Sequence, residues 1–277
     1  MTAQRHTVSD LLRIMQRLRD PQHGCPWDLA QSFESIVPST LEECYELAAA
    51  IEAGDYPHVA DELGDVLFQV VFYAQLGTEE GYFSFDEIVH GLAAKLLRRH
   101  PHVFPQGQID GIVEERIDAQ TVKAQWESIK AGERAGRAQH GAMDDVPTAL
   151  PALPRAQKLQ KRAARVGFDW HGEAPVLEKL AEETGELHEA LAGDDPAAIE
   201  EEIGDLLFTV ANLARHRKID AESALRRASH KFERRFRSME SAAAGRGATL
   251  DELDAAALDD LWRAAKRELD SGEGDPG

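Results

Sequence analysis

The sequence repeats itself, and the two copies constrain the fold more than any other feature. Residues 41–71 and 180–211 share one pattern of acidic and apolar residues. Four acids of each copy align at a constant spacing, so that Glu43, Glu46, Glu62 and Asp65 correspond to Glu183, Glu186, Glu202 and Asp205. Further along, at a spacing four residues shorter, Lys95, Arg98, Arg99 and Trp126 correspond to Lys231, Arg234, Arg235 and Trp262. The pattern indicates a tandem duplication, in which both halves fold as the same kind of unit.

Each copy has the periodicity of helices and little strand-like alternation. In the second copy, one apolar stripe recurs at spacings of three and four residues, formed by Ile203, Leu206, Leu207, Val210 and Leu213. We therefore expect an all-α protein made of two tandem helical-bundle repeats. Glycine and proline interrupt the helical pattern between residues 131 and 154. The expected boundaries are a first repeat at 1–133, a linker at 134–154, a second repeat at 155–268 and a disordered tail at 269–277.

The aligned acids predict a metal site in each repeat. Glu183 and Glu186 are three residues apart and share a helix face, and Glu202 and Asp205 do the same on the next helix. The turn signal at 193–196 lies midway between the pairs, so both pairs would sit about 12 Å from the turn in an antiparallel hairpin. Four facing carboxylates need a cation, and an all-oxygen set favours Mg²⁺, or Mn²⁺, over zinc. The first repeat offers a second candidate site of the same kind at Glu43, Glu46, Glu62 and Asp65.

Two other interpretations of these acids are a pair of solvated helix faces and a di-iron bundle. Solvated faces explain a single Glu-x-x-Glu well, but they do not explain two pairs placed symmetrically about a turn and present twice. A di-iron bundle requires Glu-x-x-His on two helices. His188 follows Glu186 by two residues rather than three, which disfavours iron.

A group of cations and one aromatic residue stands out against the formal net charge of −19. Lys231, Arg234 and Arg235 share one helix face and suit phosphate oxygens. Trp262 and Lys266, four residues apart, could stack on a base and touch a phosphate, although surface basicity and a core tryptophan are the ordinary alternatives. Asp220 and Ser84 are expected to cap the helices that carry the basic residues. The sequence contains no Walker A loop and no G-x-G-x-x-G motif, so a P-loop or Rossmann enzyme is not supported.

The bulk composition limits the partners and the compartment. The acidic excess would repel a phosphate backbone, so direct nucleic-acid binding is not expected. No run of 18 uncharged apolar residues is present, so we expect no membrane span. The two cysteines, Cys25 and Cys44, form no zinc or redox motif and are expected to be reduced in a cytoplasm.

At these residues the chain resembles the MazG family, tandem-repeat members of the all-α nucleotide pyrophosphohydrolases. The family pattern E-E-x-x-E followed by E-x-x-D stands at 182–186 and 202–205, and CPWD at 25–28, VGFDW at 166–170 and KFERRF at 231–236 add to the resemblance. It implies Mg²⁺ on Glu183, Glu186, Glu202 and Asp205, and a nucleotide surrounded by Lys179, Lys231, Arg234, Arg235 and Trp262. It also implies a homodimer that hydrolyses (d)NTP to (d)NMP and pyrophosphate, for nucleotide-pool control or housecleaning.

The expected mechanism is attack of a metal-activated water on the α-phosphorus, with Glu182 or Glu201 as the base. We expect the second repeat to carry most of the activity, because Ser39 stands in the first repeat where the second has Lys179. Two alternatives are a narrower, dUTPase-like enzyme of the same superfamily and a non-catalytic acidic helical scaffold.

Overall fold

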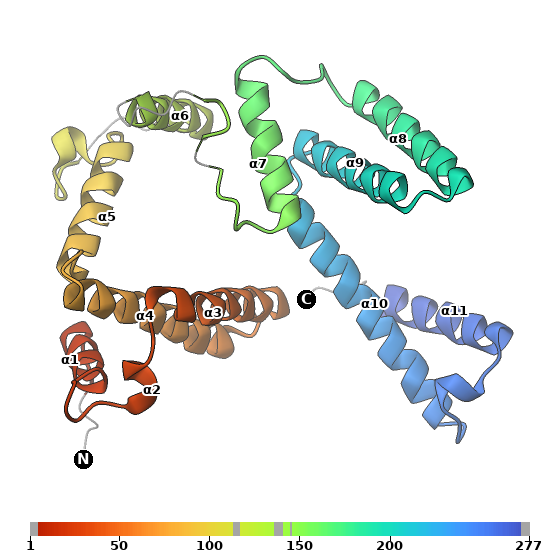
Figure 1. Cartoon of the computed structure of the whole chain (residues 1–277), viewed down its shortest axis with the longest axis horizontal. Helices are drawn as coiled ribbons and strands as arrows, with labels where there is room; N and C mark the ends of the chain where they lie inside the picture. The colour runs from red at the N-terminus through yellow and green to blue at the C-terminus, as the bar shows by residue number, and fades with distance from the viewer. Residues whose placement is uncertain (1–4, 113–116, 136–140, 145, 273–277) are drawn as a thin grey trace. The chain divides into compact units, whose positions relative to one another are not determined.

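A computed structural model describes residues 5–112, 117–135, 141–144 and 146–272 of the chain. All elements in these ranges are helices, which confirms the predicted all-α class (Figure 1). The chain divides into two compact units, residues 1–134 and 135–277. No helix within the described ranges is both long enough and apolar enough to cross a membrane.

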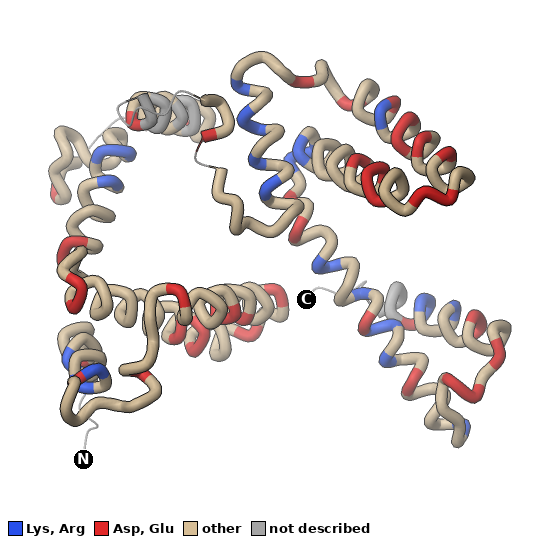
Figure 2. Tube along the Cα trace, viewed as in Figure 1, with Lys and Arg blue, Asp and Glu red and all other residues tan. Residues whose placement is uncertain are grey.

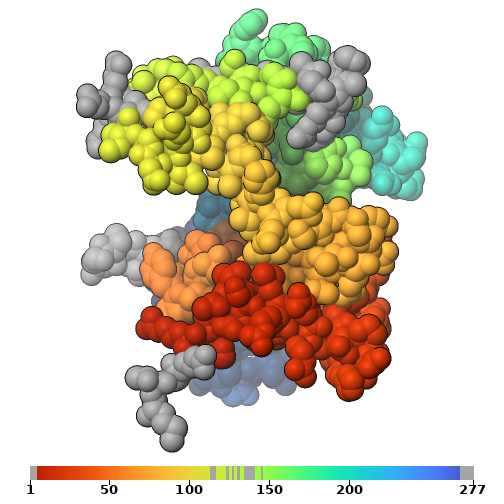
Figure 3. All heavy atoms as spheres, turned by 90° about the vertical axis from the view of Figure 1, so that its left-hand side faces the viewer, coloured from red at the N-terminus to blue at the C-terminus, as the bar shows by residue number. Residues whose placement is uncertain are grey.

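The first unit is organised around a long helical hairpin. Its helices are α1 (Val8–Leu18), α2 (Pro26–Leu29), α3 (Phe33–Ala53), α4 (Tyr56–Glu79), α5 (Phe85–Arg99) and α6 (Ala119–Ala135), with a short 3₁₀ turn η1 at Pro105–Gly107. The helices α3 and α4 pack along each other, and α1 and α5 pack on α4. Figure 3 shows the red spheres of the N-terminal segment lying against the amber spheres of the helices that follow. Between α1, α3 and α4 lies an apolar core of Met15, Ile36, Val71, Phe72 and Leu76.

The second unit repeats the hairpin and adds a second helix pair. Its helices are α7 (Ala152–Arg165), α8 (Ala174–Gly193), α9 (Pro196–His216), α10 (Ala221–Ala244) and α11 (Ala255–Gly272), with a 3₁₀ turn η2 at Leu250–Glu252. Helix α9 packs on both α7 and α8, while α11 packs on α10. The α10–α11 pair has a small core of its own, made of Met239, Ala243, Leu261 and Ala265.

The turn of each hairpin, which brings the acids of its two helices side by side, is formed by local capping residues. In the second hairpin, Asp194 ends α8 in the left-handed region with φ of 53°, and the Asp195 side chain accepts a hydrogen bond from the backbone N–H of Ala197. In the first hairpin, Gly54 takes the left-handed position with φ of 71°, and Asp55 caps α4 by accepting from His58. The predicted turn midway between the acid pairs is therefore confirmed.

The predicted helix caps are also present, and the element ends differ slightly from those expected. Ser84 caps α5 and Asp220 caps α10 through their side-chain oxygens. Helix α7 begins at Ala152, inside the segment expected to be the linker, and α6 extends into its start. Helix α11 continues through Gly272, past the expected start of the tail at 269. Residues 136–140, 145 and 273–277 lie outside the described part of the chain.

The apolar stripe on α9 is only partly used inside this chain. Ile203, Leu207 and Val210 are exposed. The buried positions of the same helix are Thr209, Ala211 and Asn212. In the part of the chain that the structure describes, these apolar side chains of the second hairpin thus remain exposed.

Candidate active site

Each hairpin brings three glutamates together. In the second unit, ligand oxygens of Glu183 and Glu186 on α8 and Glu202 on α9 lie within 4.8 Å of one another. In the first unit, the same holds for Glu43 and Glu46 on α3 and Glu62 on α4. We call these sets the second triad and the first triad. Figure 2 shows the acids gathered along both hairpins.

The fourth predicted acid of each site lies beside its triad but is not a member of it. Asp205 and Asp65 are both exposed. Their charges still reach the triads, because Asp205 helps to raise the pKa of Glu202 and Asp65 helps to raise the pKa of Glu43. Each site is therefore three converging carboxylates with a fourth at its edge.

A lysine occupies the second triad. Glu183 is only 4% exposed, and its Oε1 lies 2.9 Å from Nζ of Lys179. The same ammonium is 2.7 Å from Oε1 of Glu182 and 4.0 Å from Oε2 of Glu186. Hydrogen bonds to Glu182 and Glu183 raise the pKa of Lys179 above its ordinary value. The ammonium thus offsets part of the negative charge of the triad.

The remaining acids of the second triad still repel one another. Partial burial is the first cause that raises the pKa of Glu202, followed by the charges of Glu183, Asp205 and Glu201. Desolvation also raises the pKa of Glu186. Lys179 opposes this rise, and the charges of Glu202 and Glu183 add to it. Raised carboxyl pKa values at converging acids mark a site short of positive charge.

The first triad has a different neighbour. Glu62 is 6% exposed, and its Oε1 lies 2.6 Å from Nε2 of His58, one turn earlier on α4. The other oxygen of Glu62, Oε2, is buried and has no hydrogen-bond partner. Burial, and then the charges of Asp65, Glu46 and Glu62, raise the pKa of Glu43. Alanine stands at position 198, which corresponds to His58, as Ser39 corresponds to Lys179.

The residues of both triads fit a hard divalent cation. All the converging donors are carboxylate oxygens, which Mg²⁺ and Mn²⁺ prefer. The unpartnered Glu62 Oε2 is a buried acceptor that a bound cation would satisfy, and a buried polar atom without a partner is costly. The donor set therefore supports a divalent metal at this site.

The two candidate bases differ in their contacts. Glu182 is exposed and paired to Lys179, one residue from a triad member. Glu201 is exposed and adjacent to Glu202, whose pKa its charge helps to raise. Both carboxylates are placed at the edge of the triad, where a water molecule can reach them.

The predicted cations and tryptophan gather on the other helix pair. Lys231, Arg234 and Arg235 lie on α10, and Trp262 and Lys266 lie on α11. The Trp262 ring is 5.4 Å from the Phe232 ring, and the Arg235 guanidinium lies 5.8 Å from the Trp262 centroid. Figure 1 shows α11 packed along the second half of α10, whereas the second triad lies on α8 and α9. Within one chain the acids and this basic group are thus carried by separate helix pairs.

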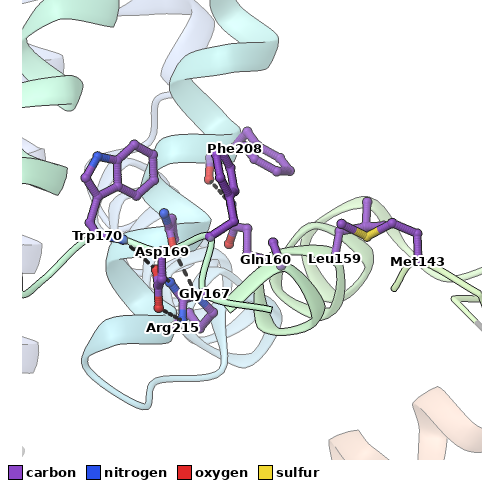
Figure 4. A pocket seen from close by; sticks show the side chains of 11 residues that line it. Met143, Leu159, Gln160, Gly167, Asp169, Trp170, Phe208 and Arg215 are labelled. Carbon is purple, nitrogen blue, oxygen red and sulfur yellow. Dashed lines mark hydrogen bonds and ion pairs between the residues drawn. The ribbon is translucent and has the colours of Figure 1, made fainter. Parts of the chain in front are cut away.

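A cavity on α9, the helix that also carries Glu202 of the second triad, was not predicted from the sequence. It has a volume of about 410 Å³ and is lined by Met143 and by residues of α7, α9 and the segment before α8, among them Gln160, Asp169, Trp170, Phe208, Asn212 and Arg215 (Figure 4). Arg215 forms an ion pair with Asp169 and donates a hydrogen bond to Oδ1 of Asn212, at 2.8 Å. The VGFDW motif supplies Asp169 and Trp170, but spacing alone gave no reason to connect that motif with α9.

Two polar side chains form the floor of this cavity. Asn212 is 2% exposed. Gln160 is also buried, and its Nε2 donates to the backbone oxygen of Phe208 at 2.8 Å, while its Oε1 is buried without a hydrogen-bond partner. A concave, mostly apolar site with a few convergent polar groups is the usual form of a small-molecule pocket.

The first unit differs at the corresponding places. Phe72 stands where the second unit has Asn212, and it is 1% exposed within the apolar core. Arg98 and Arg99, which correspond to Arg234 and Arg235, both pair with Glu133 on α6, at 2.6 Å and 2.5 Å. In the first unit an internal acid therefore already binds the arginine pair.

Comparison with known proteins agrees with these features. The model of the MazG nucleotide pyrophosphohydrolase domain matches residues 31–104 and 172–239, which contain both hairpins. A nucleoside triphosphate pyrophosphohydrolase from Escherichia coli (strain K12) is 51% identical over 94% of this chain and 97% of its own length. A nucleoside triphosphate pyrophosphohydrolase/pyrophosphatase MazG from Thermotoga maritima is 44% identical over 93% of this chain and 94% of its own. With both repeats matched and nearly the whole length aligned, the chain belongs to the MazG nucleotide pyrophosphohydrolase family.

Proposed function

We propose that this protein hydrolyses nucleoside triphosphates, (d)NTP, to (d)NMP and pyrophosphate, and that its second repeat carries the active site. One observation carries the proposal: the second triad and the cavity share helix α9. Asp205 and Asn212 are seven residues apart, about 10 Å along the helix. That separation suits a nucleotide whose base enters the cavity while its first phosphates reach the acids.

Each acid of the site has a role in this proposal. Glu183, Glu186 and Glu202, with Asp205 at the edge, would hold Mg²⁺, which Mn²⁺ could replace. When bound, the cation would neutralise phosphate charge and make water a better nucleophile at neutral pH. Glu182 or Glu201 would orient the attacking water and accept its proton, so that the water adds to the α-phosphorus in line with the departing pyrophosphate.

The cavity would hold the nucleobase. The Phe208 and Trp170 rings at its rim offer aromatic faces for the base (Figure 4). The unpartnered Gln160 Oε1 would accept a hydrogen bond from an N–H group of the base, and every common base has such a group on its polar edge. A Gln160→Leu variant should therefore raise KM more than it lowers kcat.

A homodimer would complete the site. Lys231, Arg234, Arg235, Trp262 and Lys266 could stabilise the pyrophosphate group, but they are carried by α10 and α11 rather than by the hairpin with the acids. The exposed Ile203, Leu207 and Val210 on α9 give a second copy an apolar face to cover. Light scattering of the purified chain tests this part of the proposal, with a mass of twice 30.6 kDa expected.

The proposed reaction is tested by its products. The protein is incubated with each of the eight common ribo- and deoxyribonucleoside triphosphates and Mg²⁺, and the products are separated by anion exchange. Monophosphate with pyrophosphate is expected. Diphosphate with orthophosphate would place the cut at the wrong bond and overturn the proposal.

A further inference from the structure

The ammonium group of Lys179 lies among the carboxylates that are expected to bind a metal ion. This group lies 2.9 Å from the buried Glu183 and 4.0 Å from Glu186, two members of the second triad. It also contacts Glu182 at 2.7 Å. One lysine thus bridges three carboxylates from within their own helix α8, as a cation shared among them would.

The first triad has no such internal cation. Ser39 occupies the position of Lys179, and its hydroxyl carries no charge. The imidazole of His58 contacts one oxygen of Glu62 from a half-exposed position, and the other oxygen stays buried without a partner. Among the residues that the structure describes, both triads thus consist of three glutamates, but only the second has a lysine ammonium that offsets their negative charge.

We propose that Lys179 is a resident counter-ion of the second triad, which a divalent cation must displace. The first triad, which lacks this lysine, then takes up metal without nucleotide more tightly than the second. This inference rests on the metal site of the proposed function and adds an order of events to it. The metal enters the second triad together with the nucleotide, because the phosphates give the displaced lysine a new anionic partner.

Charge and flexibility support the displacement. An ammonium and a dication cannot share one set of carboxylates without strong repulsion at these distances. The four-carbon stem of lysine lets its ammonium move several ångströms without moving the helix. The divalent cation and the triphosphate both bind better when Lys179 has left the triad. Binding of either one therefore favours binding of the other, so the two become coupled in the second repeat.

The test measures metal binding without nucleotide, in variants that exchange Lys179 and Ser39 between the two repeats. The full chain is titrated with Mn²⁺ alone, and free Mn²⁺ is followed by electron paramagnetic resonance. Glu62→Gln silences the first triad and isolates the second, and Glu202→Gln does the reverse. In the Glu62→Gln protein, Lys179→Ser should tighten Mn²⁺ binding by about tenfold. In the Glu202→Gln protein, Ser39→Lys should weaken Mn²⁺ binding by a similar factor.

Three further measurements sharpen the result. Lys179→Met keeps the side-chain length and removes the charge, so it should tighten binding as Lys179→Ser does. Lys161→Ser on α7 removes a lysine elsewhere in the second unit and should leave Mn²⁺ affinity unchanged. Adding a non-hydrolysable triphosphate should strengthen Mn²⁺ binding of the Glu62→Gln protein more than that of its Lys179→Ser derivative.

The proposal is overturned if Lys179→Ser and Lys179→Met, each in the Glu62→Gln background, change the Mn²⁺ affinity by less than twofold. It is also overturned if neither of these two variants binds Mn²⁺. Its failure can be told from failure of the proposed function. If turnover is normal and metal affinity is unchanged by the lysine, only the counter-ion role fails. If the Glu62→Gln protein neither binds Mn²⁺ with a triphosphate nor releases pyrophosphate, the proposed function fails as well.

Discussion

The two repeats keep the same glutamates and surround them differently. In the second, Lys179 of α8 bridges the acids, and a cavity with buried polar side chains opens on α9, the helix that carries Glu202. In the first, the position of Asn212 is filled by the core residue Phe72, and Glu133 binds the arginine pair. A duplicated set of converging acids is therefore retained while the residues at the positions of Asn212 and of the arginine pair make other contacts in the first repeat. The neighbours of the acids, rather than the acids themselves, distinguish the two repeats.

The largest difference is expected when one triad at a time loses a ligand. Glu202→Gln should lower pyrophosphate release by about a hundredfold or more, because the metal contributes several kcal/mol to such reactions. Glu62→Gln should lower it by less than about threefold, since the buried Phe72 stands in the first repeat where the second has the cavity residue Asn212. Steady-state release of pyrophosphate from both variants measures the contrast. Comparable losses would mean that the repeats share the work.

The next prediction exploits the filled core of the first repeat. Phe72→Ala removes a ring that is 1% exposed and should destabilise the protein by about 3–5 kcal/mol. Phe208 lines the cavity of the second unit and is 42% exposed, so Phe208→Ala should cost less than about 1 kcal/mol. Urea unfolding of both variants, followed by circular dichroism, gives the two values. Equal costs would show that the cavity is packed as tightly as the core.

Filling the cavity should separate substrate binding from metal binding. Asn212→Phe places the first repeat's residue in the second and should lower kcat/KM by about tenfold, mainly through KM. Phe208→Trp narrows the same cavity from its exposed rim and controls for any loss of the Arg215 hydrogen bond. Mn²⁺ binding should stay unchanged in both. A folded Asn212→Phe protein with the parent kcat/KM would place the base elsewhere.

The smallest effect concerns the internal acid of the first repeat. Hydrogen bonds from Arg99 and Arg98 lower the pKa of Glu133 from 4.5 to about 2. A lowered folded-state pKa gives stability that is fully present above pH 4.5 and is lost as the pH falls toward 2. Glu133→Gln should therefore lower the thermal midpoint by a few degrees at pH 6 and by much less at pH 2, where about half of the carboxyl is protonated. A difference that persisted undiminished at the lower pH would contradict the ion pair.

The helices and the acid triads could be predicted from the sequence because they depend on local rules. A spacing of three places Glu183 and Glu186 on one face, and a turn between Glu186 and Glu202 brings the second helix back beside the first. The cavity depends on contacts between segments far apart in the chain, such as Asp169 with Arg215, which no spacing reveals.

The partner of Lys179 could not be predicted from the sequence either. The i, i+4 spacing to Glu183 allows an ion pair, and a resemblance to nucleotide-binding proteins suggests a phosphate contact instead. The structure has the ion pair, and displacement by a cation would allow both contacts at different stages. The separation of the basic group from the acids was also not foreseen, because the sequence does not state which helices pack together.

The central claim is that the second repeat directs water to the α-phosphorus of a triphosphate. It is tested most directly by hydrolysis in ¹⁸O-labelled water with the Glu62→Gln protein, whose second triad alone is intact. Mass spectrometry of the products should find one ¹⁸O in the monophosphate and none in the pyrophosphate. Label in the pyrophosphate, or no hydrolysis by this variant, would contradict the account.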